Sequence, residues 1–296
     1  MSSSSRVWLI TGTSSGFGLE TARLALAKGD RVVATLRRPE VLNDFAAQYP
    51  ASQILVLRLD VSKPGEIKEA FAQAKAVFGR IDVVFNNAGY AVVGEAEGVP
   101  AETARAMFNV NYWGAVGVSQ EAVRFFREEN VPQGGRLIQN SAGMGLVTLP
   151  TFAFYSSSKH ALEGFTETLE KELDPTWNIK ITSVLCGGFV TDFSGSVQLS
   201  PPHPAYKGGA NAATAMREGM LKLVDAGTRV EEQKKLGFSD ASKAVKKIYE
   251  LSELTSPPLR LLLGKDVNRG VRQYIAQLTK EADAYESWSD NLEYDH

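Results

Sequence analysis

The sequence predicts an α/β protein built on a doubly wound, Rossmann-type parallel sheet of about seven strands with helices on both faces. Short apolar runs alternate with longer helical patterns, the order that right-handed βαβ units produce. The apolar runs are continuous in hydrophobicity, as expected of strands that helices cover on both faces. No internal repeat or long linker divides the 296 residues, so we expect a single domain over 1–296.

Each predicted element is a short segment bounded by polar or turn residues. The strands are expected at residues 7–10, 31–35, 54–57, 83–85, 136–138, 180–185 and 259–263. The helices are expected near residues 18–28, 40–48, 65–78, 102–129, 152–173, 240–253 and 267–283. Strands and helices therefore alternate as a doubly wound sheet requires.

The composition excludes several classes of protein. A net charge of −2 and a pI of about 6.0 give no basic surplus for a nucleic-acid partner. No apolar run approaches the roughly 20 residues of a membrane-spanning helix, and the polar start of the chain carries no secretory signal. A single cysteine fits a reducing compartment, and three scattered histidines show no metal-ligand spacing. We expect a cytoplasmic protein without a metal site.

Two segments stand outside the alternation of strands and helices. Residues 187–237 are longer than a simple connection and carry several large apolar side chains, which favours a substrate-binding loop. The tail at 283–296 is acidic and contains no lysine or arginine. It is expected either to be solvated or to pack Trp288 and Tyr294 on a neighbour.

A glycine-rich turn follows the first predicted strand and opens the first helix. Residues 11–18 read Thr-Gly-Thr-Ser-Ser-Gly-Phe-Gly, with the spacing G-x-x-x-G-x-G. Glycines there permit a tight turn and let backbone N–H groups approach a pyrophosphate at the helix N-terminus. A small-residue turn of purely structural use is the alternative, but the position between strand and helix favours dinucleotide binding.

The end of the second predicted strand indicates which dinucleotide the chain would bind. NAD-preferring sites place an acidic residue there to bind the adenine ribose hydroxyls. This chain instead has Arg37 and Arg38 and no acid. Because a guanidinium suits a 2′-phosphate, NADP(H) is favoured over NAD(H), unless the arginines are only solvated residues at the start of a helix.

Tyr155 and Lys159 are the candidate acid/base pair. Four residues apart in a predicted helix, they share one face. A nearby ammonium favours the ionised phenol, which ordinarily titrates near ~10. A tyrosine and a lysine at this spacing also occur by chance, so the catalytic interpretation of the pair depends on the motifs in the rest of the chain.

Over roughly residues 6–280 the sequence resembles the short-chain dehydrogenase/reductase family, similar to the branch that holds hydroxysteroid and retinol dehydrogenases. The resemblance implies nicotinamide-cofactor binding by one ordered set of residues. These are Thr11, Gly12, Ser14, Ser15, Gly16, Phe17, Gly18, Arg37, Asp60, Val61, Asn87, Ala88, Gly89, Tyr155, Lys159, Gly187, Val190 and Thr191.

The same resemblance implies a catalytic set of Asn111, Ser141, Tyr155 and Lys159. Tyr155 would exchange a proton with the substrate oxygen, while Lys159 would favour the tyrosinate and bind the nicotinamide ribose. Ser141 would hydrogen-bond the substrate oxygen, and Asn111 would anchor a water.

The chain departs from the family pattern at two places. The family usually spaces its serine thirteen residues before the tyrosine, whereas Ser141 lies fourteen before Tyr155. Either the glycine-containing loop after Ser141 holds an insertion, or Ala142 stands at the serine position. Cys186 replaces the usual proline, and a buried, inert thiol is favoured there over a catalytic one.

These observations favour an NADP(H)-dependent carbonyl reductase or alcohol dehydrogenase for a bulky, mostly apolar ketone, aldehyde or secondary alcohol. The pocket is expected to be lined by the residues at 90–93, 144–149, Phe152 and the 187–237 segment. A non-catalytic NADP(H)-binding sensor or scaffold is the alternative from another class. A third hypothesis is a different reaction on the same fold, such as epimerisation or dehydration. Relatives that catalyse those reactions usually carry a T-G-x-x-G-x-x-G turn, which this sequence lacks.

Family members often form homodimers or homotetramers through the helices expected at 102–129 and 152–173. Such pairing requires apolar outer faces. Phe125, Phe126, Leu162 and Phe165 are candidates for those faces or, equally, for the core.

Overall fold

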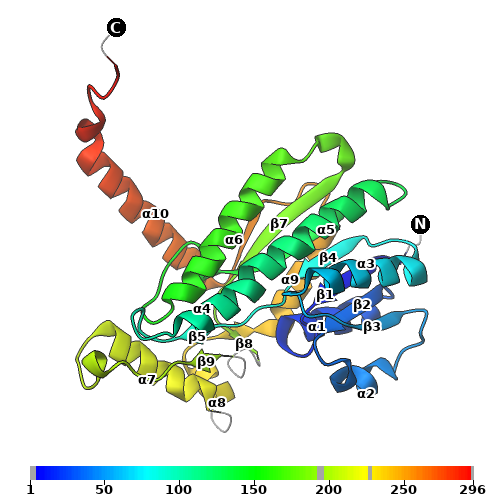
Figure 1. Ribbon diagram of the computed structural model, residues 1–296, viewed down its shortest axis with the longest axis horizontal. Helices are drawn as coiled ribbons and strands as arrows, with labels where there is room; N and C mark the ends of the chain where they lie inside the picture. Colours follow the sequence, from blue (N-terminus) through cyan, green and yellow to red (C-terminus); the bar gives the residue numbers. More distant parts are fainter. Residues whose placement is uncertain (1–4, 192–196, 226–228, 295–296) are drawn as a thin grey trace.

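The computed structural model describes residues 5–191, 197–225 and 229–294. Parts of the predicted polar start, substrate segment and acidic tail lie outside these residues. The described chain is organised around one parallel sheet of seven strands in the order β11-β7-β6-β4-β1-β2-β3. The doubly wound sheet expected from the sequence is therefore confirmed (Figure 1).

The seven strands lie close to the predicted positions. Their bounds are β1 (Val7–Thr11), β2 (Arg31–Leu36), β3 (Ile54–Arg58), β4 (Val83–Asn86), β6 (Gly135–Ala142), β7 (Ile179–Cys186) and β11 (Arg260–Leu263). From β1 the chain runs outward through β2 and β3, then returns to β4 on the other side of β1. This reversal creates a switch point between β1 and β4, where doubly wound proteins bind ligands.

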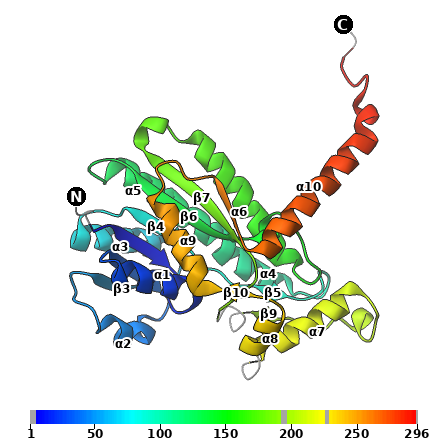
Figure 2. The ribbon, with the colours of Figure 1, turned by 180° about the vertical axis from the view of Figure 1, so that it is seen from behind.

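Helices cover both faces of the sheet (Figures 1 and 2). One face packs against α1 (Gly16–Ala27) and α9 (Ala241–Glu253). The other packs against α3 (Pro64–Phe78), α5 (Ala115–Glu128) and α6 (Ala153–Glu172). Three candidates for an apolar outer face, Phe125, Phe126 and Leu162, are each at most 1% exposed and lie in the core, and Phe165 is half-buried.

The helix expected over 102–129 is divided. It consists of α4 (Ala101–Phe108), a π-helical segment (Asn109–Gly114) and α5. Gly114 lies close to the turn that follows β3, because a Cβ on Gly114 would be 2.7 Å from Val61 Cγ2. π-Helical turns are frequent at functional sites, and this one carries Asn111. Similarly, the helix expected near 40–48 is a 3₁₀ turn (Pro39–Leu42) followed by the short α2 (Asn43–Ala46).

Strand β6 is longer than the predicted 136–138 and continues through Ala142. Its extra residues, Gln139, Asn140 and Ser141, are polar and so fall outside the apolar pattern used to find strands. Gln139 is satisfied from neighbouring elements, because it accepts a hydrogen bond from Asn86 Nδ2 at 2.8 Å and donates one to Ser119 Oγ at 2.7 Å. A buried amide network thus replaces apolar packing at the end of this strand.

The predicted substrate segment forms a small lobe at the carboxyl ends of the strands. It contains β8 (Phe189–Val190), β9 (Gln198–Leu199), α7 (Ala212–Val224) and α8 (Arg229–Lys235). Two short parallel pairings attach it to the body, β9 to β5 (Val92–Val93) and β8 to β10 (Ser239–Asp240).

The last helix, α10 (Lys265–Tyr285), starts against β11 and then leaves the body, carrying the C-terminus away from it (Figures 1 and 2). No helix of the described chain combines the length and the apolar character needed to cross a membrane.

Candidate active site

The glycine-rich turn joins β1 to α1 at the switch point. Gly12 has φ +71°, and a Cβ on Gly18 would lie 2.3 Å from the Gly12 carbonyl oxygen. Both positions therefore require glycine. Asn87 fixes the turn from β4, because its Nδ2 donates to the carbonyl oxygens of Thr11 at 2.9 Å and Gly12 at 3.1 Å.

Thr11 holds the same turn from the other side. Its Oγ1 accepts hydrogen bonds from the backbone N–H groups of Asn87 at 2.8 Å and Ala88 at 2.9 Å. Thr35, on β2, accepts from the N–H groups of Gly12 and Thr13. These hydrogen bonds hold the turn against β2 and β4, and sequence reasoning missed Thr35 because it lies 22 residues beyond Thr13.

The N-terminus of α1 is open to an anion. Ser15 is its N-cap with extended backbone, yet no side chain caps the helix and its first turn holds no acidic residue. Ser14 and Phe17 flank this position, and the Phe17 ring packs edge-on against Phe189. Backbone N–H groups and the helix dipole thus favour negative charge here, which fits a pyrophosphate.

The residues expected at the adenine end lie beside the ends of β2 and β3. Arg37 is exposed. Burial raises the pKa of Asp60, but hydrogen bonds from Ser62 and the charge of Arg37 bring it below its ordinary value. Burial raises the pKa of Tyr90, and the charge of Arg37 partly opposes that shift. The Arg37 guanidinium therefore lies near Asp60, next to the buried Val61.

Tyr155 and Lys159 lie together on α6, as their spacing predicts. Both side chains are buried, and Lys159 Nζ lies 5.8 Å from the centre of the Tyr155 ring. Burial lowers the pKa of Lys159 to about 8, and burial, with a smaller contribution from Cys186, raises the pKa of Tyr155. The sequence predicted a lowered phenol pKa from Lys159 alone; desolvation of the ring outweighs that effect here.

Asn111 anchors the loop beside this pair. Its Oδ1 accepts from Tyr90 N at 3.0 Å, and its Nδ2 donates to Tyr90 O at 2.8 Å. Gly89 lies between Asn111 and the lysine, since a Cβ there would be 3.1 Å from Asn111 Oδ1 and 3.8 Å from Lys159 Nζ. The structure thus brings Asn111, Tyr155, Lys159 and the end of β4 into one site.

Ser141 and Ala142 lie on opposite faces of β6. The Ser141 side chain is buried towards α6, with its Oγ 3.1 Å from the place of a Cβ on Gly145 and without a hydrogen-bond partner among the described groups. Ala142 belongs to the apolar cluster that contains Tyr155 and Phe152. The geometry therefore does not bring the Ser141 hydroxyl to the side of Ala142, and it fits the register with Ala142 at the serine position.

Asn140 belongs to this site, although no motif in the sequence assigns it a role. Its backbone oxygen accepts from Lys159 Nζ at 2.9 Å, and its Nδ2 donates to Asn87 Oδ1 at 2.7 Å. Its Oδ1 also accepts a hydrogen bond from Cys186 Sγ at 3.5 Å. Asn140 therefore links the buried lysine to the residue that fixes the glycine turn, a relation that only strand pairing creates.

Cys186 is a buried thiol at the end of β7. Burial raises its pKa to about 12, with Lys159 opposing the shift. A thiol with so high a pKa holds little thiolate at neutral pH, so the structure agrees with an inert cysteine.

The residues after β7 reach back to the glycine turn. Gly187 donates its N–H to Leu263 O at 2.9 Å, and a Cβ there would collide with Asp266. Val190 and Thr191 line a groove of about 490 Å³ together with Gly16. The predicted cofactor residues from three distant parts of the chain thus meet around the N-terminus of α1.

Apolar side chains surround Tyr155. Residues expected to line the substrate pocket share its cluster: Tyr90, Ala91, Val92, Val93, Met144, Phe152, Val197, Leu199, Met216, Met220 and Leu223. Leu149, by contrast, is exposed.

A buried ion pair holds the lobe to the body beside this cluster. Arg217 of α7 donates its Nε to Glu95 Oε1 at 2.9 Å and an Nη to Ser200 O at 2.7 Å. The Arg217 hydrogen bond is the main reason that the pKa of Glu95 falls to about 2. No local pattern signals this pair, since 122 residues separate its partners.

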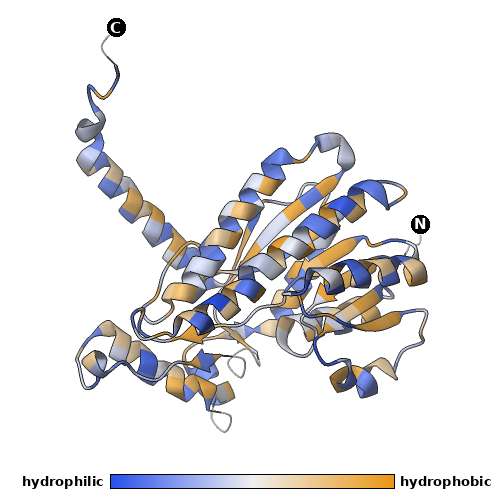
Figure 3. Ribbon diagram, in the orientation of Figure 1, coloured by the Kyte–Doolittle hydropathy of each residue, from blue (hydrophilic) through white to orange (hydrophobic). Residues whose placement is uncertain are grey.

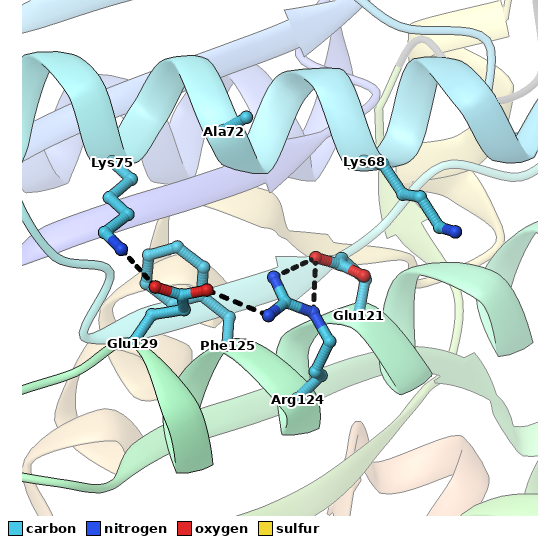
Figure 4. Close-up of a pocket in the computed structure, with 7 residues that line it drawn as sticks. All are labelled: Lys68, Ala72, Lys75, Glu121, Arg124, Phe125 and Glu129. Atoms are coloured by element: carbon cyan, nitrogen blue, oxygen red, sulfur yellow. Dashed lines mark hydrogen bonds and ion pairs between the residues drawn. The ribbon is translucent and has the colours of Figure 1, made fainter.

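A second hollow lies between α3 and α5, with a volume of about 360 Å³. Its carboxylates are neutralised locally, because Glu129 pairs with Lys75 and Arg124, and Glu121 pairs with Arg124 (Figure 4). Within the described chain, no group of three or more His, Cys, Asp or Glu residues is placed to hold a metal ion.

Comparison with known proteins agrees with this geometry. Residues 6–201 match the family model for short chain dehydrogenase. An uncharacterised oxidoreductase of Schizosaccharomyces pombe is 35% identical over 279 residues, covering 93% of this chain and 88% of that protein. An oxidoreductase of Penicillium decumbens is 34% identical over 88% of this chain and 84% of its own length.

Solved structures show the same fold. A short-chain dehydrogenase from Streptomyces avermitilis superposes with a TM-score of 0.85 at 31% identity, covering 99% of this chain and all of that one.

Proposed function

Because the chain belongs to the short-chain dehydrogenase/reductase family, whose members are oxidoreductases with a nicotinamide cofactor, we propose that it is an NADP(H)-dependent carbonyl reductase or alcohol dehydrogenase. The observation that carries the proposal is the buried Tyr155–Lys159 pair beside the glycine turn, with an apolar cluster around the tyrosine. When bound, the nicotinamide cofactor supplies or accepts the hydride.

Tyr155 is assigned as the acid/base. Because burial raises its pKa, the phenol is protonated at neutral pH and can donate a proton from Oη to a carbonyl oxygen. This favours reduction near pH 7, while the reverse reaction needs the phenolate. Lys159 has a pKa of about 8, close enough to neutrality for its ammonium to return a proton to Tyr155 after the tyrosine has given one to the substrate.

Asn111 is assigned as a positioning residue. Its amide holds the Tyr90 backbone and so fixes the loop next to Lys159. An exchangeable water beside the π-helical segment would connect Lys159 to solvent. The geometry supports Ala142, and not Ser141, as the residue facing the reaction, and substitution of each residue tests this assignment.

The cofactor preference is assigned from Arg37. The cradle fits a dinucleotide because the glycine turn is preformed and the α1 N-terminus is uncapped. Arg37 stands exposed near Asp60, and no acidic residue occupies the end of β2, so a 2′-phosphate would be bound there.

The substrate is proposed to be a bulky, mostly apolar ketone or aldehyde, or the corresponding secondary alcohol. The side chains that share the Tyr155 cluster are aliphatic, aromatic or methionine, and the α7 lobe contributes several of them. Binding in such surroundings is favourable because it removes the apolar surface of the substrate from water.

The test is NADPH consumption by the full chain over a panel of bulky ketones, aldehydes and quinones, with Tyr155→Phe beside it. We expect kcat to fall about 100-fold or more in Tyr155→Phe, the usual contribution of a general acid. NADPH binding should persist. The control is Ser157→Ala, an exposed position on the same helix.

Full turnover by Tyr155→Phe would exclude the assigned role of the tyrosine. If NADPH binds and no substrate is consumed, the alternative of a cofactor-binding sensor or scaffold is favoured. The alanine at position 142 is the observation that supports that alternative.

A further inference from the structure

Helix α6 carries a second buried charged side chain, one turn beyond Lys159. Polar and apolar segments alternate along this helix (Figure 3). Among its six acidic and basic residues, Lys159 and Glu163 are buried, whereas the other four are at least partly exposed. Glu163 is only 3% exposed. A carboxylate taken out of water is costly unless it is paired, and the roles proposed for Tyr155 and Lys159 do not account for it.

Two neighbouring strands hold the Glu163 carboxylate. On β7, Ser183 Oγ donates a hydrogen bond to Glu163 Oε1. On β11, Arg260 Nε donates to Glu163 Oε2 at 2.9 Å and forms an ion pair with it. Arg260 also donates from an Nη to Glu167 Oε2 at 2.6 Å, so the guanidinium bridges two turns of α6. Each oxygen of Glu163 therefore has a donor that fixes its position.

The fixed carboxylate lies on the same side of α6 as Lys159. The two residues are four apart in the helix and so share one face. Lys159 Nζ donates to the Asn140 backbone oxygen on β6, and Asn140 pairs with Val184, the residue after Ser183. The groups that hold the lysine and the carboxylate are therefore neighbours across β6 and β7.

The loop after β6 closes over this side of α6. A Cβ on Gly145 would lie 3.0 Å from Glu163 Cγ and 3.3 Å from the Lys159 carbonyl oxygen. Because the side chains of Lys159 and Glu163 are both buried, water screens their charges little. The carboxylate can therefore act on the lysine without a direct hydrogen bond.

Glu163 supplies the negative charge that favours the Lys159 ammonium at neutral pH. Burial lowers the pKa of Lys159 to about 8, and the charges of Cys186 and Glu163 oppose that shift. Burial raises the pKa of Cys186 to about 12 and also raises the pKa of Tyr155. The thiol and the phenol are thus neutral near pH 8, whereas Glu163 is paired as a carboxylate.

Charged groups on the neighbouring elements act elsewhere. Arg260 of β11 is paired with two carboxylates, and Asp266 of α10 acts on the Cys186 thiol. Asn111 and Asn140, which reach the site from the π-helical segment and from β6, are neutral.

We propose that Glu163 is a positioning residue for the Tyr155–Lys159 pair, whose fixed carboxylate keeps the Lys159 ammonium charged so that it can return a proton to Tyr155. This role rests on the function proposed for the pair. Without the carboxylate, the ammonium would lose its proton at lower pH, and the alkaline limit of reduction would move towards neutrality.

The first test is the titration of Lys159 in the cofactor-free protein, followed by NMR of isotope-labelled lysine. The Lys159 resonance is the one missing from Lys159→Met. In Glu163→Gln the pKa of Lys159 should fall from about 8 by about one unit, because a nearby opposite charge favours the charged form by at least that much.

The matched control is Glu167→Gln. It makes the same change on the same helix, at a carboxylate that also pairs with Arg260 but lies one further turn from Lys159. Lys159 should titrate in this variant as it does in the parent. Identical titration of Lys159 in the parent and in Glu163→Gln would overturn the proposal.

Folding of each variant is checked by circular dichroism, because Glu163→Gln leaves the Arg260 guanidinium with one carboxylate instead of two. If Glu163→Gln does not fold, the double variant Glu163→Gln/Arg260→Gln replaces the buried ion pair by two neutral amides. The same fall in the pKa of Lys159 is expected there, and an unchanged titration would overturn the proposal equally.

The second test is the pH profile of kcat for ketone reduction at saturating NADPH. The alkaline limb should move down by about one unit in Glu163→Gln and stay in place in Glu167→Gln. Near pH 8 this shift lowers kcat about fivefold, while kcat in mildly acidic solution stays near the parent value. A loss of equal size at every pH would indicate a purely structural role and overturn the proposal.

The two tests separate this inference from the function on which it rests. If the parent reduces no substrate, the proposed function fails, and the NMR titration still decides whether Glu163 acts on Lys159. If the titration moves and the kcat profile does not, the return of the proton by Lys159 is excluded.

Discussion

At the scale of the residue, the site depends on which side chain faces which side of a strand. Ser141 and Ala142 are neighbours in sequence, but the pleat of β6 sends them to opposite faces. Ala142 shares the cluster of Tyr155, whereas Ser141 is buried towards α6. The tyrosine and lysine are therefore proposed to act without a serine hydroxyl beside them.

This assignment predicts that Ala142→Ser raises kcat. A preorganised donor to a developing oxyanion contributes up to ~100–1000-fold, so a new hydroxyl with imperfect geometry should give about tenfold. The measurement is kcat for the best ketone with saturating NADPH. Ser141→Ala is the matched control and should keep kcat near the parent value; a large loss there would return the catalytic role to Ser141.

At the scale of the element, the lobe after β7 is held to the body by a buried pair of opposite charges. Glu95 follows β5, and Arg217 lies on α7, with side chains 2% and 10% exposed. Breaking such a pair by removing one partner leaves an uncompensated buried charge and costs about 3–5 kcal/mol. The pair therefore positions the α7 side chains that surround Tyr155.

The pair also predicts how stability depends on pH. The pKa of Glu95 is about 2 when folded and ordinarily 4.5, so the folded state favours the carboxylate. Its stabilisation, about 3 kcal/mol, is present above pH 4.5 and is lost as pH falls from there towards 2. Thermal unfolding between pH 5 and 3 measures this loss.

Glu95→Gln should have a lower melting temperature at pH 7 and a smaller further decrease on acidification than the parent. Glu97→Gln, at an exposed position two residues away, is the control and should follow the parent. Identical acid profiles for the parent and Glu95→Gln would contradict the assignment.

At the scale of the whole molecule, the cofactor cradle joins elements that are far apart in the chain. The glycine turn, the ends of β2 and β4, and the segment after β7 meet at the N-terminus of α1. A ligand bound across these elements stabilises the folded state over the unfolded chain by mass action.

We therefore expect NADPH at about 100 times its Kd to add about 2.7 kcal/mol of stability and raise the melting temperature by about 5 °C. NADH at the same concentration should raise it less. Arg37→Ala should remove the difference between the two cofactors, while Arg38→Ala should retain it. Equal effects of the two substitutions would contradict the assignment of Arg37.

The sheet and most helices could be predicted because their signals are local. Continuous apolar runs marked all seven strands, and the glycine turn and the Tyr155–Lys159 spacing were visible in short windows of sequence. The end of β6 and the π-helical segment could not, since Gln139 and Asn111 are polar and are satisfied by distant partners. A cytoplasmic location stays a prediction.

The sequence by itself therefore determined the fold class, the glycine turn and the placing of Tyr155 and Lys159 on one helix face, because each follows from the periodicity or spacing of nearby residues. Only the tertiary structure decided that Ala142 and not Ser141 lies with Tyr155, that Asn140 links Lys159 to Asn87, and that Glu95 meets Arg217. These relations arise from strand pairing and burial, which bring together groups that no local pattern connects.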